Sequence, residues 1–313
     1  MRAAFVSVDL DEVHLYRGLH GLAQRTEGGE LVSTVAVERA CAFAAELEIP
    51  LTFFVVSAEL ERPAAVRALE RALALGHAVE SHTRTHPYDL VELGAARIAD
   101  EVLGSFDDIE RRLAVRPRGF RAPGYIVNAA VFDALEQAGA RFDASVLPCP
   151  AYYFAKLAVM GALFQVGRRS SAIVGPLRST VAPRSPYRPG ADPYRIVRAG
   201  ERARSLVELP MQVTRGARLP IIGQTLALAG ERGARWLARG GADGAVFSLE
   251  LHGMDFLEAG DGLADLVGHQ PELRIGRTER MRALAAAVRE LSEKGYRFVT
   301  AARAAELATS LCI

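Results

Sequence analysis

Short apolar segments alternate with longer helical segments along most of the chain, and this alternation constrains the fold more than any other feature. The apolar segments are rich in β-branched and aromatic residues, as in LTFFVV at residues 51–56, which is typical of buried strands. Repeated strand–helix units favour a parallel sheet or barrel. Strands are expected at residues 3–8, 51–56, 77–81, 119–121, 207–209, 245–251 and 296–300, and helices at 35–47, 64–75, 90–113, 129–138 and 277–294.

The size and composition of the chain exclude several classes of protein. With 313 residues, half of them hydrophobic, it can bury a large core, which excludes a disordered chain and a small disulfide scaffold. Its net charge of +1 argues against a dedicated nucleic-acid binder. The three cysteines, Cys41, Cys149 and Cys312, are too far apart in sequence to indicate a disulfide framework or a cysteine zinc site. We expect one domain over residues 1–313 and no nucleic-acid partner.

The N-terminal segment bears on the compartment. The apolar run after Arg2 reaches an acid at Asp9, so it is shorter than the roughly 7–15 residues that a signal peptide needs. No uninterrupted apolar run approaches the roughly 20 residues that cross a bilayer. We therefore expect a reduced, cytoplasmic protein.

Residues 149–206 interrupt the strand–helix pattern, and we treat them as an irregular insertion. They contain several prolines and an apolar stretch at residues 151–166, broken only by Lys156 and Gln165. From Lys156 to Arg218 there are twelve Lys or Arg and three Asp or Glu, so the positive charge of the chain is concentrated here.

Two interpretations of this insertion remain open. The first is a solvated lid over the mouth of the barrel. The second is an amphipathic segment at residues 152–166 that contacts a lipid tail or the inner face of an anionic membrane. In the second case nearby arginines would meet lipid phosphates, among them Arg168, Arg169 and Arg178.

Polar residues that can do chemistry stand at five strand ends, namely those of four strands given above and of a further short strand that Asp143 closes. In parallel α/β folds the functional groups gather where the strands end, so residues far apart in sequence would meet there. Scattered surface residues would not be expected to collect at strand ends in this way. The residues concerned are Asp9, Asp11, His82, His86, Arg121, Asp143 and His252.

The spacing of two histidines and two aspartates indicates a metal site. His82 and His86 can reach one cation from a single turn, and Pro87 disfavours a helix continuing beyond them. A carboxylate from the first strand would complete the three ligands of a hydrolytic metal, leaving one position for water. Asp9 and Asp11 point the same way along an extended strand, so either can bind the metal while the other accepts a proton. The competing interpretation is a set of unrelated polar residues on turns.

In its motifs the chain resembles the NodB-type polysaccharide deacetylases, carbohydrate esterase family 4. The resemblance covers about residues 3–310 and implies a distorted (β/α) barrel with fewer than eight regular strands. It also implies metal-dependent hydrolysis of an N-acyl amino sugar. The segments that carry it, in the family's order, are SVDLD at residues 7–11, SHTRTH at 81–86, RAPGY at 121–125, Asp143, and LELH at 249–252.

The resemblance assigns the metal and the base by position. Asp11, His82 and His86 look like the metal ligands. Asp9 resembles the catalytic base, and Arg121 is similar to the arginine that orients this base and lowers its pKa.

The remaining roles concern the acid and the substrate. His252 looks like the general acid, and Asp143 looks like the carboxylate that tunes it. Pro123 and Tyr125 are expected to bind substrate at the wall of the site. His14, close to the first-strand aspartates in sequence, is a further candidate for substrate binding.

Two departures from the family's pattern affect these assignments. Leu10 separates two aspartates that are adjacent in the common first motif. Gly124 stands where the third motif usually has its tyrosine, and Tyr125 follows it. The second departure leaves unassigned the backbone N–H that would help to hold the oxyanion.

We therefore expect an amide hydrolase that removes an acetyl or formyl group from an amino sugar. Its cofactor would be a divalent metal, best Zn²⁺, with Co²⁺, Fe²⁺ or Ni²⁺ chemically admissible. A lipid-phosphate-linked amino sugar at the inner membrane face suits a cytoplasmic member, because the superfamily includes a deformylase of such a lipid. The alternatives are hydrolysis of a small cyclic amide and a catalytically inactive barrel that binds a glycolipid or a protein partner.

Overall fold

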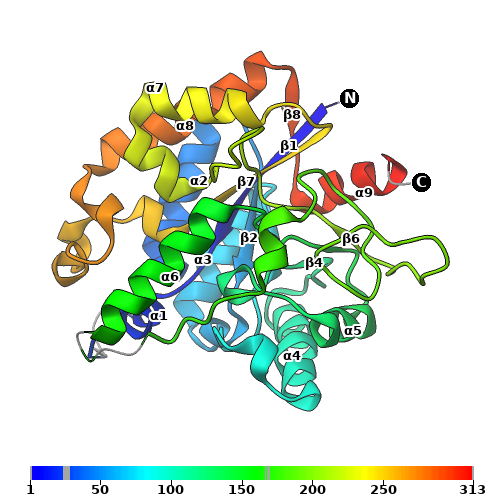
Figure 1. Ribbon diagram of the computed structural model, residues 1–313. Coiled ribbons are helices and arrows are strands. Elements are labelled where there is room, and N and C mark those ends of the chain that lie inside the picture. Colours follow the sequence, from blue (N-terminus) through cyan, green and yellow to red (C-terminus); the bar gives the residue numbers. More distant parts are fainter. Residues whose placement is uncertain (1, 24–28, 166, 168–169, 312–313) are drawn as a thin grey trace.

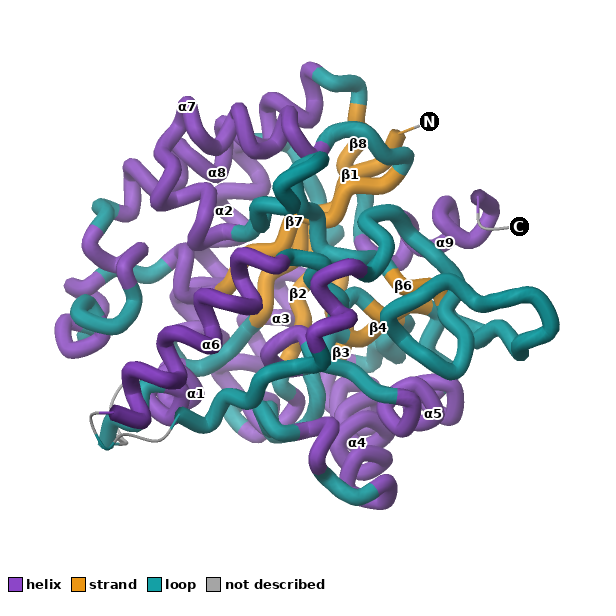
Figure 2. Tube along the Cα trace, in the orientation of Figure 1, coloured by secondary structure: helices purple, strands orange, loops and turns teal. Residues whose placement is uncertain are grey.

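The computed structural model describes residues 2–23, 29–165, 167 and 170–311, and within these ranges eight parallel strands form one sheet surrounded by helices (Figure 1, Figure 2). The strand order is β6-β5-β4-β3-β2-β1-β7, with β8 also pairing with β1. The strands are β1 (Arg2–Asp9), β2 (Leu51–Val55), β3 (Ala78–Ser81), β4 (Gly119–Phe120), β5 (Phe142–Asp143), β6 (Val207–Glu208), β7 (Val246–His252) and β8 (Tyr296–Phe298).

Strand β1 is central because it pairs with three other strands. Its N-terminal part pairs with β8, its C-terminal part with β2, and β7 pairs with it from Ala3 to Asp9. Every residue of β1 after Arg2 is buried, which explains why the sequence before Asp9 is apolar apart from Ser7. Because these pairings are parallel, β1, β2 and β7 all end at the same edge of the sheet.

The barrel is distorted and incomplete, as the sequence predicted. Strands β4, β5 and β6 have only two residues each, so five of the eight strands are longer. Between β6 and β7 the described chain makes isolated contacts instead of a ladder. Gln212 N donates to Ser248 O at 3.1 Å, and Ile222 forms a single bridge with Glu250.

Helices cover the outside of the sheet, where the hydrophobic core lies. The largest apolar cluster joins β1, β2 and β7 to α2, α3, α7 and α8, and a second one joins β4 to α4 and α5. That residues 1–313 form a single domain stays a prediction. The helices are α1 (Val13–Leu19), α2 (Val37–Glu46), α3 (Pro63–Ala74), α4 (Ala95–Leu113), α5 (Ala129–Ala138), α6 (Pro150–Gln165), α7 (Gly223–Gly241), α8 (Arg277–Glu293) and α9 (Ala301–Leu311).

The segment at 149–206 is more regular than the sequence suggested. Its apolar stretch forms α6, a helix without one buried residue that crosses in front of the sheet in Figure 1. Apolar residues lie all round α6, so the expectation of an amphipathic segment was wrong. Phe154 is 58% exposed and Phe164 is 79% exposed. None of the helices in the described ranges combines the length and apolarity that spanning a bilayer requires.

Much of the positive charge of this segment is paired with acids within the chain. Arg204 forms ion pairs with Asp133 and Glu136 on α5. Arg178 contacts Asp192 within the segment itself. The Arg204 pairs attach the segment to α5, and the Arg178 pair neutralises charge within the segment, so its arginines are not simply a free basic surface. Arg168 and Arg169 lie outside the described residues.

Candidate active site

The first-strand aspartates lie at the mouth of the barrel, where β1 ends. Asp9 is fully buried, and its Oδ1 accepts a hydrogen bond from Arg121 at 2.5 Å. Its second oxygen, Oδ2, has no hydrogen-bond partner among the described residues and lies 3.9 Å from His82 Nε2. Asp11, two residues further on, has its Oδ1 at 3.1 Å from His82 Nε2 and 3.3 Å from His86 Nε2.

The two histidines are brought together by a tight loop after β3. Thr83 and His86 both have positive φ, 66° and 61°, so the chain turns sharply between the two imidazoles. The Thr83 hydroxyl accepts the backbone N–H of His86 at 3.0 Å. From α4, Glu101 accepts hydrogen bonds from the backbone of Arg84 and Thr85. This carboxylate, which our sequence analysis missed, holds the loop in place.

Asp11, His82 and His86 fit a divalent metal. Their candidate ligand atoms lie within 4.8 Å of one another, and all three residues are buried. Within the part of the chain that the structure describes, the buried atoms Asp11 Oδ1 and His86 Nε2 have no hydrogen-bond partner, which is costly unless something binds them. His82 donates its Nδ1 proton to the carbonyl of Arg121 at 2.7 Å, which leaves Nε2 free to coordinate.

The electrostatics of the two aspartates differ. Burial alone would raise the pKa of Asp11, but His86 and His82 together lower that pKa well below its usual range. Asp11 is thus held ionised, as a metal ligand must be. For Asp9, burial raises the pKa above its ordinary value, although Arg121 opposes the shift. The positive charge of Arg121 therefore offsets only part of the increase in the pKa of Asp9 that burial causes.

A second cluster, formed by Asp9, Glu250 and His252, stands beside the first. Glu250 Oε1 lies 2.7 Å from His252 Nδ1. Burial disfavours the charged imidazole, but Glu250 prevails and raises the pKa of His252 well above its ordinary value. His252 Nε2 lies 3.8 Å from Asp11 Oδ2. Tyr125 donates its hydroxyl proton to Glu250 at 3.2 Å and is 3.4 Å from His252 Nε2.

The structure does not bring Asp143 to His252. Asp143 instead accepts a hydrogen bond from the Ser145 hydroxyl at 2.7 Å and contacts Glu208, its neighbour on β6. The carboxylate beside the imidazole is Glu250. The sequence contained a signal for it, because Glu250 and His252 are two residues apart on one strand and so share a face.

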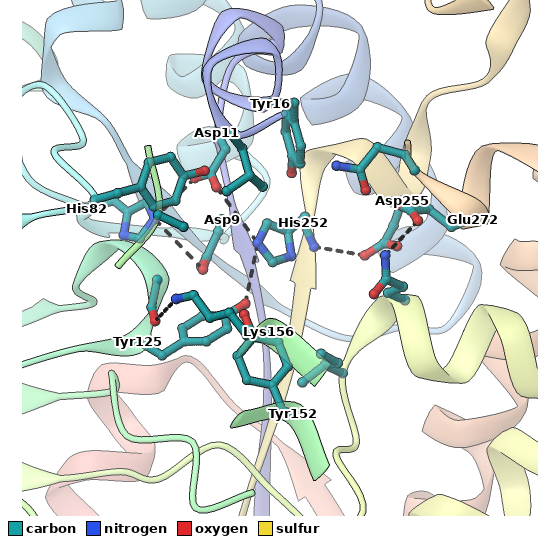
Figure 3. A pocket seen from close by; sticks show the side chains of 17 residues that line it. Asp9, Asp11, Tyr16, His82, Tyr125, Tyr152, Lys156, His252, Asp255 and Glu272 are labelled. Carbon is teal, nitrogen blue, oxygen red and sulfur yellow. Dashed lines mark hydrogen bonds and ion pairs between the residues drawn. The ribbon is translucent and has the colours of Figure 1, made fainter. Parts of the chain in front are cut away.

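The clustered residues open into a cavity of about 160 Å³. Figure 3 shows Asp9, Asp11 and His252 pointing into it, with Tyr152 and Lys156 from α6 on one side. Four tyrosines contribute to the wall. The lining residues include Asp9, Asp11, Tyr16, His82, Tyr88, Gly124, Tyr125, Tyr152, Lys156, Gln224, His252, Asp255, Gln270 and Glu272.

Three expectations about substrate contacts have different outcomes. Tyr125 lines the cavity as predicted, but Pro123 is buried outside its lining. His14 is also outside the lining, because the first turn of α1 directs its side chain to Glu59, with Nε2 4.0 Å from Oε1. The residues of α1 that reach the cavity are Tyr16 and Leu19. The backbone N–H of Tyr125 donates to Ala122 O, so it is already used within the turn.

Comparison with known proteins supports the fold. A family model for polysaccharide deacetylases matches residues 30–142. A Mycobacterium smegmatis protein assigned to the polysaccharide deacetylases aligns over 99% of this chain and 91% of its own, with TM-score 0.60 and 16% identity. A carbohydrate esterase family 4 pseudoenzyme from Bacillus anthracis aligns over 97% of this chain and 65% of its own, with TM-score 0.50 and 10% identity. A mutant of that pseudoenzyme with restored enzymatic activity aligns with TM-score 0.51 and 11% identity, over 97% and 67%.

The Asp143–Glu208 pair predicts a pH-dependent cost in stability. Burial, and then the nearby charge of Asp143, raise the pKa of Glu208 well above its ordinary value. The folded chain therefore keeps a proton that the unfolded chain releases above about pH 4.5, so stability falls as pH rises from there towards the folded pKa. Glu208→Gln removes this cost while keeping a hydrogen-bond donor for Asp143.

We expect the melting temperature of Glu208→Gln, relative to the native chain, to increase steadily between about pH 5 and pH 8. Thermal unfolding followed by circular dichroism at several pH values measures it. The exposed Glu92→Gln provides the matched control, for which the difference should stay flat. If the melting-temperature difference for Glu208→Gln also stayed constant with pH, the folded chain would not keep a proton on Glu208, and the prediction would be contradicted.

Proposed function

We propose that the chain, which a family model for polysaccharide deacetylases matches over residues 30–142, is a NodB-type metal-dependent hydrolase that removes an N-acyl group from an amino sugar. One observation carries the proposal. Asp11, His82 and His86 converge on one point, while Asp9 Oδ2 and His252 Nε2 stand beside it in the same cavity. A base, an acid and a metal triad within one cavity form the set that amide hydrolysis needs.

We propose that Asp11, His82 and His86 hold the metal. Two imidazoles and a carboxylate suit Zn²⁺, although other divalent ions of the first transition series are chemically compatible. When bound, such an ion supplies Lewis acidity, which lowers the pKa of a bound water towards about 7 and polarises an amide carbonyl.

The protein's own residues would then move the protons. Asp9 accepts the proton of the attacking water at Oδ2 as the new C–O bond forms, and Arg121 holds its other oxygen in place. His252, kept cationic by Glu250, donates a proton from Nε2 to the amine as the C–N bond breaks. The products are a carboxylic acid, acetate or formate, and a free amino sugar.

An amino sugar is favoured over a small cyclic amide by the walls of the cavity. Tyr16, Tyr88, Tyr125 and Tyr152 all line it. Aromatic side chains present an apolar face and a hydroxyl that together suit a sugar ring. Asp255 and Glu272 add carboxylates that can accept hydrogen bonds from sugar hydroxyls.

Two substitutions separate the metal from the base. Asp11→Asn should abolish stoichiometric zinc binding, while Asp9→Asn should retain zinc and lose about 10²–10⁴-fold in kcat because the general base is gone. Zinc is measured by atomic absorption after gel filtration, and acetate or formate release from N-acyl glucosamine oligomers gives the rate. If the native chain binds zinc but releases neither acid, a barrel that only binds ligands becomes the better account.

The Glu250–His252 pair predicts a change in the pH profile. Because Glu250 raises the pKa of His252, Glu250→Gln lowers it. A general acid must be protonated, so kcat/KM falls above its pKa, and the alkaline limb should move to lower pH in the variant. An alkaline limb at the same pH in both proteins would show that His252 is not the titrating acid.

We also propose that α6 contacts an anionic lipid bilayer next to the cavity. Its residues Phe154, Leu157 and Phe164 are exposed, and none of the residues of α6 is buried by the described part of the chain. The net basic charge of the surrounding segment matches an anionic surface. A lipid-linked amino sugar would then enter the cavity from the membrane.

Vesicles of phosphatidylglycerol test this contact. Replacing Phe154, Leu157 and Phe164 by Ser should reduce sedimentation with vesicles by about tenfold or more, because less apolar area can enter the lipid. Trp236→Ser on α7 is the matched control, since Trp236 is 61% exposed but lies elsewhere. Equal sedimentation of both variants and the native chain would refute the membrane contact.

A further inference from the structure

Lys156 is an unusual residue in this chain, both by type and by position. All but two of its 38 lysine and arginine residues are arginines, and the two lysines are Lys156 and Lys294. Lys294 ends α8 at the surface. Lys156 lies on the otherwise apolar α6, and its side chain turns into the catalytic cavity and also lines a smaller neighbouring cavity of about 30 Å³.

The ammonium group of Lys156 has no charged partner within the described part of the chain. Its recorded hydrogen bond is a long one, 3.5 Å from Nζ to the carbonyl oxygen of Gly124. Burial lowers the pKa of this lysine to about 8, which reflects its partial removal from water. A desolvated cation with so little compensation costs free energy, and an incoming anion would offset that cost.

Gly124 makes the room that Lys156 occupies. This is the glycine that separates Pro123 from Tyr125 and departs from the pattern noted in the sequence. Its φ of +62° disfavours other residues, and a Cβ at this position would lie 3.3 Å from Lys156 Nζ. The insertion of a glycine and the presence of a lysine opposite it thus form one local arrangement at the wall of the cavity.

The other side of the cavity has the opposite charge. Asp255 accepts the backbone N–H of His252, and Glu272 accepts a hydrogen bond from Gln224. Figure 3 shows these two carboxyl groups across His252 from Lys156 and Tyr152. An anionic group would be repelled at the acidic side, whereas sugar hydroxyls can donate hydrogen bonds there. The cavity can therefore orient a ligand that has hydroxyls at one end and an anion at the other.

We propose that Lys156 binds an anionic substituent, a phosphate or a carboxylate, on the amino sugar whose amide is hydrolysed. This inference rests on the proposed function for the identity of the ligand and narrows its substrate to acidic amino sugars. Lysine provides a compact point charge, which suits either anion. Tyr152, on the same helix, lines the cavity next to Lys156 and can donate its hydroxyl proton to the same anion.

Binding measurements on the zinc-loaded protein test the proposal. The probes are N-acetylglucosamine, N-acetylglucosamine 1-phosphate and N-acetylmuramic acid, each titrated by calorimetry. Lys156→Gln should weaken binding of an anionic probe roughly 10- to 150-fold, the usual value of a hydrogen bond to a charged group, and leave the neutral probe unchanged. Lys156→Arg should restore part of the loss, and Lys294→Gln is the matched control.

The two anionic probes distinguish the source of the charge. A loss confined to the 1-phosphate assigns a phosphate to the substrate, and a loss confined to N-acetylmuramic acid assigns a carboxylate. The proposal is overturned if Lys156→Gln weakens all three probes equally, or if the native protein binds neither anionic probe more tightly than N-acetylglucosamine. If anionic probes bind through Lys156 but no amide is cleaved, the proposed function fails and the subsite stands.

A second measurement labels Lys156 in the folded native protein, so it does not depend on the folding of a variant. Reductive methylation with ¹³C-formaldehyde labels Lys156, Lys294 and the N-terminal amine. Adding the anionic probe should shift the Lys156 resonance and leave that of Lys294 in place, while N-acetylglucosamine should shift neither. A Lys156 resonance that ignores the anionic probes would overturn the assignment.

Discussion

The site depends on one buried guanidinium group. Arg121, at the end of β4, donates to Asp9 and Ser7 on β1 and to the Ala144 carbonyl after β5. Its own carbonyl accepts from His82 after β3, and its side chain lies 4.3 Å from the ring centroid of Phe54 on β2. One residue thus fixes the relative positions of five strand ends, and removing a partner from such a buried pair typically costs about 3–5 kcal/mol.

Around this arginine, the same burial has opposite consequences for neighbouring groups. Desolvation penalises every charge, so the protonation state of each group depends on its partners. The two imidazoles beside Asp11 keep it ionised, Glu250 keeps His252 cationic, and burial raises the pKa of Asp9 against the opposing charge of Arg121. Groups with divergent pKa values in one cavity are the arrangement from which an acid and a base can be assigned.

Most of the fold and much of the site could be predicted from the sequence, because strand ends and the spacing of His82 and His86 follow directly from periodicity. The prediction was wrong for the carboxylate beside His252, which was sought at another strand end although it lies two residues away on the same strand. Asp143 occupies the expected place in the sequence, yet Glu250 contacts the histidine. The nature of α6 could not be predicted either, since a helix that is apolar on all sides is normally buried, whereas this one is exposed.

Anomalous diffraction at the zinc edge, from crystals of the zinc-loaded protein, tests the central claim most directly. The account predicts one anomalous peak, bonded to Asp11 Oδ1 and to the Nε2 atoms of His82 and His86, with Asp9 still paired with Arg121. A peak among Asp9, Glu250 and His252 instead, or no peak within the cavity, would contradict it.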